Sequence, residues 1–72
     1  MTTNERARRS YAVYQLARNV KGMTDYKVSQ AAGIRPSSLS DWKSGRYTPK
    51  YETLRKIANV LDIPVDMFLK ED

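Results

Sequence analysis

Apolar residues recur along the chain at helical spacing, and no stretch alternates in the manner of a β-strand. The clearest pattern follows the i, i+3, i+4, i+7 template of one helix face, with Leu54, Ile57, Ala58 and Leu61. It predicts a helix that breaks at Asp62 and Ile63, before Pro64. Four other segments also favour helix, so the expected fold class is all-α, a compact bundle of five short helices.

A first helix is predicted from about residue 4 or 5 to Lys21, where Gly22 stops it. Its apolar stripe is Ala7, Tyr11, Tyr14, Ala17 and Val20, and Arg6, Arg9 and Arg18 lie off that stripe. We expect the two tyrosines in the core or an interface rather than at a ligand. Residues 1–13 are an N-terminal extension whose first part, up to about Arg9, can form a frayed arm.

A second helix is predicted to begin after Thr24, a good N-cap, with Asp25 in its first turn. Its buried side is expected to consist of Val28, Ala31 and Ala32. Gly33 should end it, because glycine readily adopts the left-handed conformation that follows many helices.

The third helix should begin at Pro36, since proline suits the first helical position. Leu39 and Trp42 are expected to point inward together with Ile34, and Gly45 closes the helix. At 100° per residue, the opposite side carries Ser37, Ser40, Asp41 and Ser44. This side is short, polar and rich in hydroxyl groups.

A loop, "RYTP" (46–49), follows, and Thr48 is expected to cap the next helix before Pro49. The final segment, "PVDMFLK" (64–70), predicts a short last helix or turn. Its Val65, Phe68 and Leu69 are expected to cover the bottom of the core.

The composition narrows the function. The chain has 72 residues, no cysteine and no histidine, which removes disulfides, thiolate metal sites and the usual general base. We expect one domain over 1–72, not an enzyme, with no cofactor, no small-molecule ligand and a cytoplasmic location. Asp62 and Asp66 are a weak metal signal without a third ligand.

The uneven distribution of charge along the chain indicates a polyanionic binding partner. The net charge is +5, but residues 1–50 hold ten basic and three acidic residues, whereas 51–72 hold three basic and five acidic ones. A basic pole is typical of nucleic-acid binders, although an ordinary lysine excess on a solvated surface remains an alternative.

Two helices joined by a short link with a glycine form a helix-turn-helix, in which the second helix is held rigidly and projects from the domain. Such a helix fits the major groove of B-DNA, and small outward side chains let its backbone approach the bases. The alternative is a polar, solvated face on an ordinary bundle helix.

Three motifs make the predicted class of helix-turn-helix more specific: "GMTDYKVSQAAGI", "SSLSDWKSGRYTP" and "LRKIANVLDIPVDMFL". The chain from about Tyr14 to Leu69 resembles the Cro and phage-repressor (XRE) family of helix-turn-helix domains. The resemblance implies a lambda-repressor-like fold and sequence-specific binding of double-stranded DNA by a small transcriptional regulator, which we expect to be a repressor of the phage or mobile-element type.

The resemblance also assigns residues. Contacts to bases would come from Pro36, Ser37, Ser38 and Asp41. Contacts to phosphates would come from Thr24, Asp25, Arg35, Ser40, Lys43, Ser44, Arg46, Tyr47 and Lys50. Departures from the family are Asp25 in place of a common Gln, Lys43 in place of an acidic residue, and Arg35–Pro36 in place of a capping hydroxyl and a Gln.

Several roles stay open. Asp41 can read a cytosine amine, repel most sequences, or pair locally with Lys43 or Arg46. Tyr47 can bind a phosphate or pack over Trp42, which is itself expected in the core. Arg6, Arg8 and Arg9 form either a basic arm on DNA or an exposed helical face.

A homodimer on DNA is expected, because two recognition helices then meet successive major grooves. The interface is predicted at Val65, Met67, Phe68 and Leu69, with Tyr51 as a further candidate. Two rival functions are a protein-interaction module such as an antitoxin or anti-repressor, motivated by Asp25 and Asp41, and a non-specific nucleic-acid binder.

Overall fold

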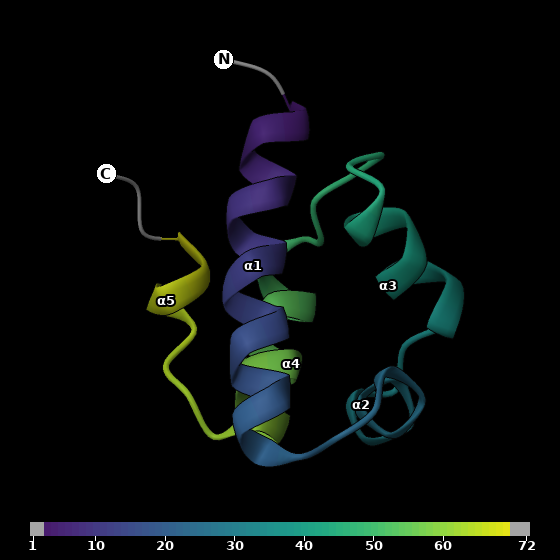
Figure 1. Cartoon of the computed structure of the whole chain (residues 1–72), viewed down its shortest axis with the longest axis vertical. Helices are drawn as coiled ribbons and strands as arrows, with labels where there is room; N and C mark the ends of the chain where they lie inside the picture. Colours follow the sequence, from purple (N-terminus) through teal and green to yellow (C-terminus); the bar gives the residue numbers. More distant parts are fainter. Residues whose placement is uncertain (1–2, 70–72) are drawn as a thin grey trace.

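A computed structural model describes residues 3–69, and over that range it contains five helices and no strand. The helices are α1 (Thr3–Lys21), α2 (Asp25–Ala32), α3 (Pro36–Lys43), α4 (Tyr51–Leu61) and α5 (Asp66–Leu69). The predicted all-α class and lambda-repressor-like architecture are confirmed (Figure 1). None of the helices in this range is long and apolar enough to cross a membrane.

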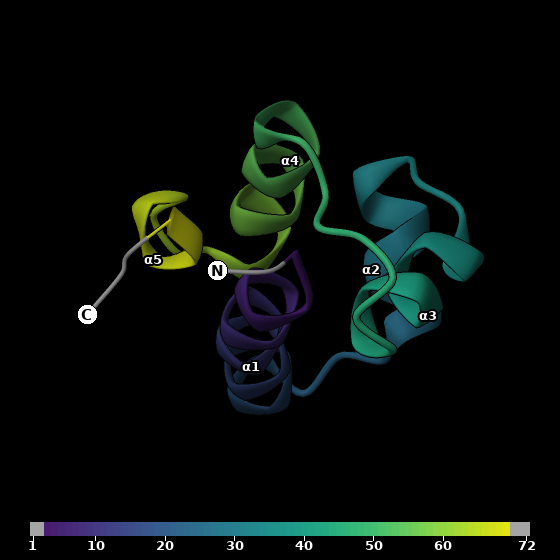
Figure 2. The ribbon, with the colours of Figure 1, turned by 90° about the horizontal axis from the view of Figure 1, so that it is seen from above.

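α1 and α4 lie side by side in the middle of the molecule (Figure 2). The short α5 packs on one side of α1 and α3 packs on the other side, while α2 packs against α4 and α3 (Figures 1 and 2). The ribbons of α3 and α5 therefore lie on opposite sides of α1, and the two helices meet inside the core, where Trp42 packs against Phe68.

The core is built from the inner faces of all five helices. α4 contributes the residues that its periodicity predicted, Leu54, Ile57, Ala58 and Leu61, and all four are at most 3% exposed. The largest side chains in the core are Trp42 and Tyr14, both completely buried. The predictions for these two residues and for the α4 stripe are confirmed.

α1 departs from its prediction at both ends. Ala7, Tyr11 and Tyr14 are buried as expected, but Val20 is 82% exposed, so the predicted stripe is wrong at its last position. Three successive steps of three residues turn a stripe by about 60° each, and they carry position 20 away from the core. At the other end, α1 is helical from Thr3 and Ala7 is fully buried, so residues 3–13 form part of the packed helix rather than an arm.

α2 buries Val28 and Ala32, but Ala31 is exposed and Ser29 takes the buried position instead. The prediction of Ala31 as a core residue is wrong. Ser29 can be buried because its hydroxyl donates to the carbonyl of Tyr26 at 2.7 Å, which satisfies its polar atom within the helix.

Two turns around α4 show how it begins and ends. It ends where the sequence predicted, with Asp62 in the left-handed conformation (φ 63°) and the Ile63 N–H bonded to the carbonyl of Ala58 at 3.0 Å. Its N-cap is Lys50 rather than Thr48, so the predicted cap is wrong. The buried Thr48 hydroxyl finds no hydrogen-bond partner among the described residues.

Candidate nucleic-acid interface

The turn between α2 and α3 sets the angle of the third helix. The Thr24 hydroxyl accepts from the Lys27 N–H at 3.2 Å and so caps α2, and Gly33 follows α2 at φ 72°, both as predicted. The Gly33 N–H bonds to the Gln30 carbonyl at 3.2 Å and the Ile34 N–H to the Ser29 carbonyl at 2.9 Å. These two bonds close α2, so α3 begins only three residues later at a fixed direction.

α3 has an inner face and an outer face. Leu39 and Trp42 point inward and are at most 2% exposed. On the outer side, the predicted Ser37, Ser40 and Ser44 are exposed and the predicted Asp41 is half-buried. Lys43, which is exposed, and Ser38, which is half-buried, also lie outside the core. Pro36 and Arg35, at the start of the helix, are also exposed. We call this outer side the serine-rich face.

Aromatic rings brace α3 from behind. The Trp42 ring lies 5.1 Å from that of Tyr14, 5.5 Å from Tyr11 and 5.7 Å from Phe68, measured between centroids. Aromatic pairs at such distances stabilise beyond their burial alone. Because the three partners lie on α1 and α5, the position of α3 is fixed by elements remote in sequence.

Ser10 is a partner of Trp42 that sequence reasoning missed. The Trp42 indole N–H donates to the Ser10 hydroxyl at 2.9 Å, and this hydroxyl in turn donates to backbone carbonyls of α1. A buried indole N–H without an acceptor would destabilise the fold. The helical spacing of Ser10 to Ala7 and Tyr14 was the available signal, because it places the hydroxyl on the buried side of α1.

A second missed cluster ties α2 to α1. One carboxylate oxygen of Asp25 accepts from the Tyr14 hydroxyl at 2.6 Å and from the Arg18 guanidinium at 3.1 Å. The guanidinium also lies over the Tyr14 ring, 5.8 Å from its centroid. Arg18, predicted off the packed stripe, has a side chain only 19% exposed. Asp25, which was assigned to a phosphate contact, therefore already has two hydrogen-bond partners within the chain.

This cluster makes stability depend on pH at the alkaline end. Burial, reinforced by donation to Asp25, raises the pKa of Tyr14 far above its ordinary value of 10.0, and burial also raises the pKa of Tyr11. Above pH 10 the unfolded chain loses these protons while the folded chain keeps them. The stabilisation is therefore complete below pH 10 and falls as the pH rises further, by up to about 1.4 kcal/mol per pH unit for Tyr14.

We expect the unfolding free energy of Tyr14→Phe to fall less steeply with pH above pH 10, because the contribution of Tyr14 is removed. The same variant should be less stable at neutral pH, because Asp25 loses a hydrogen-bond donor. Urea unfolding at intervals between pH 8 and 11 measures both effects. Tyr26→Phe, at an exposed site on α2, is the matched control and should leave the slope unchanged. Equal slopes for the parent chain and Tyr14→Phe would contradict the account.

Cations surround the serine-rich face. Arg35, Lys43, Arg46 and Lys50 are all exposed. The Arg46 guanidinium lies 3.9 Å from the Asp41 carboxylate, which matches the local ion pair that the sequence allowed. Both side chains are about half exposed or more, so this pair is weak and its members remain available to other partners. Tyr47 is half-buried and packs against the core.

The residues predicted for a dimer interface do not all lie on the surface. Phe68 is only 6% exposed and packs edge-on against Trp42, so it belongs to the core and cannot line a surface contact. Val65 is half-buried against the core, whereas Met67 and Leu69 are 45% and 47% exposed. Tyr51, at the start of α4, is 53% exposed.

Arg6, Arg8 and Arg9 lie on the exposed side of α1. The structure therefore shows a helical face rather than an extended arm at these positions, and their contact with DNA stays a prediction. Arg9 forms a loose ion pair with Glu5 at 3.5 Å.

Comparison with known proteins agrees with this geometry. The family model described as helix-turn-helix matches residues 15–68, which include α2, the turn, α3 and α4. No curated protein matches the chain closely enough to be called a relative. The match spans three-quarters of the 72 residues and leaves out the N-terminal half of α1. The chain therefore belongs to the XRE-type helix-turn-helix family of DNA-binding regulators.

Proposed function

We propose that the chain binds a specific double-stranded DNA sequence with α3 in the major groove, as a small repressor of the phage or mobile-element type. One observation carries the proposal: the serine-rich face of α3 is open to solvent while its opposite face is locked by Leu39 and Trp42. The major groove of B-DNA, about 12 Å wide, admits a helix of this kind. Short hydroxyl side chains allow the backbone to come close to base edges.

Base contacts are assigned to Pro36, Ser37, Ser38 and Asp41, because they occupy the first turns of the exposed or half-exposed side of α3. Serine makes short, adaptable hydrogen bonds and discriminates weakly between bases. Sequence-dependent shape of the duplex is therefore expected to supply part of the specificity.

Phosphate contacts are assigned to the rim of this face. Exposed cations reach the sugar–phosphate backbone and set affinity and register, whereas base contacts set sequence choice. The rim consists of Thr24, Asp25, Arg35, Ser40, Lys43, Ser44, Arg46, Tyr47 and Lys50. Among these, Asp25 and Tyr47 are the weakest candidates, since Asp25 is bonded to Tyr14 and Arg18 and Tyr47 packs on the core.

The acidic residues motivated the rival function, a protein-interaction module. Asp25 and Asp41 each lie beside an arginine of the same chain, Arg18 and Arg46. This neutralisation reduces the repulsion that either carboxylate would exert on phosphates. The pairing therefore favours the DNA-binding proposal over the rival, whose only motive was these two charges.

Selection of bound fragments from random duplex DNA tests the proposal. We expect an enriched sequence, bound about a thousandfold or more tightly than random DNA, with log K falling steeply as log[salt] rises. Steep salt dependence without enrichment would indicate a non-specific binder. Little salt dependence and no enrichment would instead support the protein-interaction module.

The same selection separates the readings of Asp41. If its carboxylate accepts from a cytosine amine, one position of the selected site is cytosine and loses that preference in Asp41→Ala. If Asp41 serves only as the partner of Arg46, the selected sequence is unchanged by the substitution.

Self-association belongs to the proposal as well. Two copies bound to one site would place their α3 helices in major grooves about one helical turn apart. The exposed part of the C-terminal segment, Met67 and Leu69, is the starting point for the contact between them.

A further inference from the structure

α1 carries a second apolar stripe, of which Val13 and Ala17 pack partly against the core. Val13, Leu16, Ala17 and Val20 follow the i, i+3, i+4, i+7 template of a helix-packing face. This stripe lies beside the buried one, and its Leu16 and Val20 are 67% and 82% exposed. Large apolar side chains at such spacing and exposure are typical of a face that packs against another helix.

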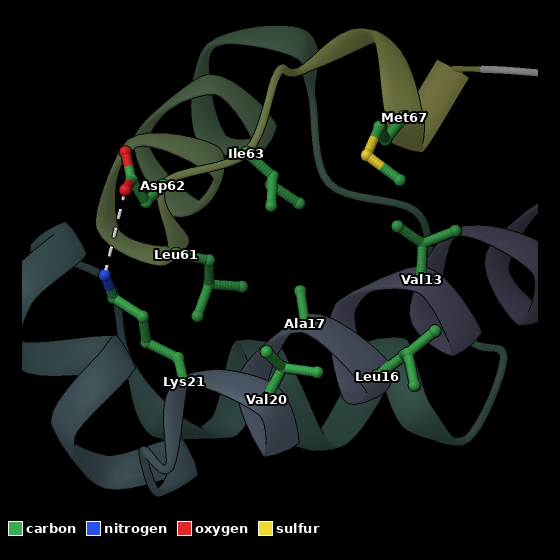
Figure 3. Close-up of a pocket in the computed structure, with 9 residues that line it drawn as sticks. All are labelled: Val13, Leu16, Ala17, Val20, Lys21, Leu61, Asp62, Ile63 and Met67. Carbon is green, nitrogen blue, oxygen red and sulfur yellow. Dashed lines mark ion pairs between the residues drawn. The ribbon is translucent and has the colours of Figure 1, made fainter.

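The stripe is one wall of a groove. The other wall is formed by Leu61 at the end of α4, Ile63 in the link and Met67 on α5 (Figure 3). The groove has a volume of about 420 Å³ and is apolar except at one end, where Lys21 and Asp62 face each other. We call it the α1–α5 groove.

We propose, building on the dimer proposed above but independently of DNA binding, that a second copy of this chain occupies the α1–α5 groove across a two-fold axis, with the two α1 helices antiparallel. In such an interface the same patch must fit itself. This patch can be self-complementary, because Leu16 and Val20 protrude from it and the groove lies beside them.

The charges at the two ends of the groove favour a second copy over an unrelated helix. Arg9 lies one turn before Val13 on the same side of α1, and Asp62 lies at the opposite end. Their partners within the chain are loose, at 3.5 Å from Glu5 and 3.9 Å from Lys21. Antiparallel α1 helices bring Arg9 of each copy to the end of the other copy's groove that holds Lys21 and Asp62, where Arg9 can replace Lys21 as the partner of the Asp62 carboxylate.

The size of a dimer interface also requires α1. A specific interface covers about 800 Å² on each partner, which is roughly a sixth of the 5095 Å² surface of this chain. Met67 and Leu69 alone are too small for that, because Phe68 and most of Val65 are turned inward. The α1 stripe adds the exposed side chains of Leu16 and Val20 to the possible contact.

α5, which contributes Met67 to the groove, lies on the side of α1 away from α2 and α3 (Figures 1 and 2). A second copy bound there leaves the serine-rich faces of both copies uncovered. Self-association through the groove and binding of a duplex by α3 can therefore be measured separately.

Sedimentation equilibrium of the full chain without DNA tests the surface. The parent chain should show a monomer–dimer equilibrium. Leu16→Glu should raise the dissociation constant of the dimer at least about tenfold, because the variant loses the burial of the leucine side chain on association. Tyr26→Glu makes the same kind of change on α2, outside the groove, and should leave the equilibrium unaltered. A monomer at all concentrations, or a dimer indifferent to Leu16→Glu, would overturn the proposal while leaving DNA binding by α3 untouched.

A charge exchange tests the two-fold arrangement. Arg9→Glu should weaken the dimer, and adding Asp62→Lys to the same chain should restore it, because the two residues contact each other only between copies. Thermal melts show whether Asp62→Lys, at its positive φ, still folds. If the folded double variant associates no better than Arg9→Glu alone, the antiparallel arrangement is wrong.

Discussion

Trp42→Ala is expected to leave the chain largely unfolded at room temperature. Truncating a buried tryptophan costs about 3–5 kcal/mol, and the core of so small a domain rarely supplies more than that in total. The loss is large here because Trp42 is completely buried and contacts three aromatic rings from two other helices. Far-UV circular dichroism should show little helix and no cooperative melt.

Two further variants make this result specific. Trp42→Phe keeps an aromatic ring but leaves the Ser10 hydroxyl without its donor, so an intermediate loss of stability is expected. Tyr26→Ala removes an exposed ring of α2 and should change stability by no more than about 0.5 kcal/mol. If Trp42→Ala melted within a few degrees of the parent chain, the ring cluster would not be what holds α3 in place.

Ser37→Asp is expected to weaken binding to the selected DNA site on the order of a hundredfold. The substitution places a carboxylate at the exposed start of α3, where the proposed complex brings phosphates and base acceptors close, and like charges brought together there cost several kcal/mol. Folding should not suffer, because an acidic residue in the first turn of a helix is favourable. Fluorescence anisotropy with a labelled duplex measures the affinity, and a thermal melt checks the fold.

Asn59→Asp is the matched control for this variant. It adds the same charge at an exposed polar position, but on α4 rather than on α3. We expect its affinity to stay within about threefold of the parent, since charges far from the contact are screened by salt. If the two variants lost the same DNA affinity, only net charge would matter, and the proposal that α3 contacts the duplex would be contradicted.

Patterns that depend on local chemistry predicted the structure well. The α4 stripe, the cap at Thr24, the glycine turn at Gly33 and the inward side of α3 were all readable. In each case spacing or backbone conformation within a few residues decides the outcome.

Tertiary packing decided what the sequence could not. The stripe on α1 was assumed to have one buried side, whereas α1 is longer than the core it covers and Val20 lies beyond it. Ala31 and Ser29 exchanged places because the direction from which α3 and α4 approach α2 is not written in the α2 segment itself.

The polar contacts were missed for a related reason. Asp25 and Arg18 looked like surface charges, but the crossing of α1 and α2 brings them together beside Tyr14. Phe68 was expected both to cover the core and to line the dimer interface, and α5 turns it onto Trp42, so the first of these expectations is met. Such pairs join helices distant in sequence, and only the fold brings them within bonding distance.

The central claim is that the serine-rich face of α3 contacts duplex DNA. Backbone amide NMR signals of the ¹⁵N-labelled chain, followed while a selected duplex is added, test it most directly. We expect the largest shifts at Ser37, Ser40 and Asp41, with smaller shifts near Thr24 and Arg46 and little change along Leu16 to Val20. Largest shifts along α1 or α4, with the signals of α3 unmoved, would contradict it.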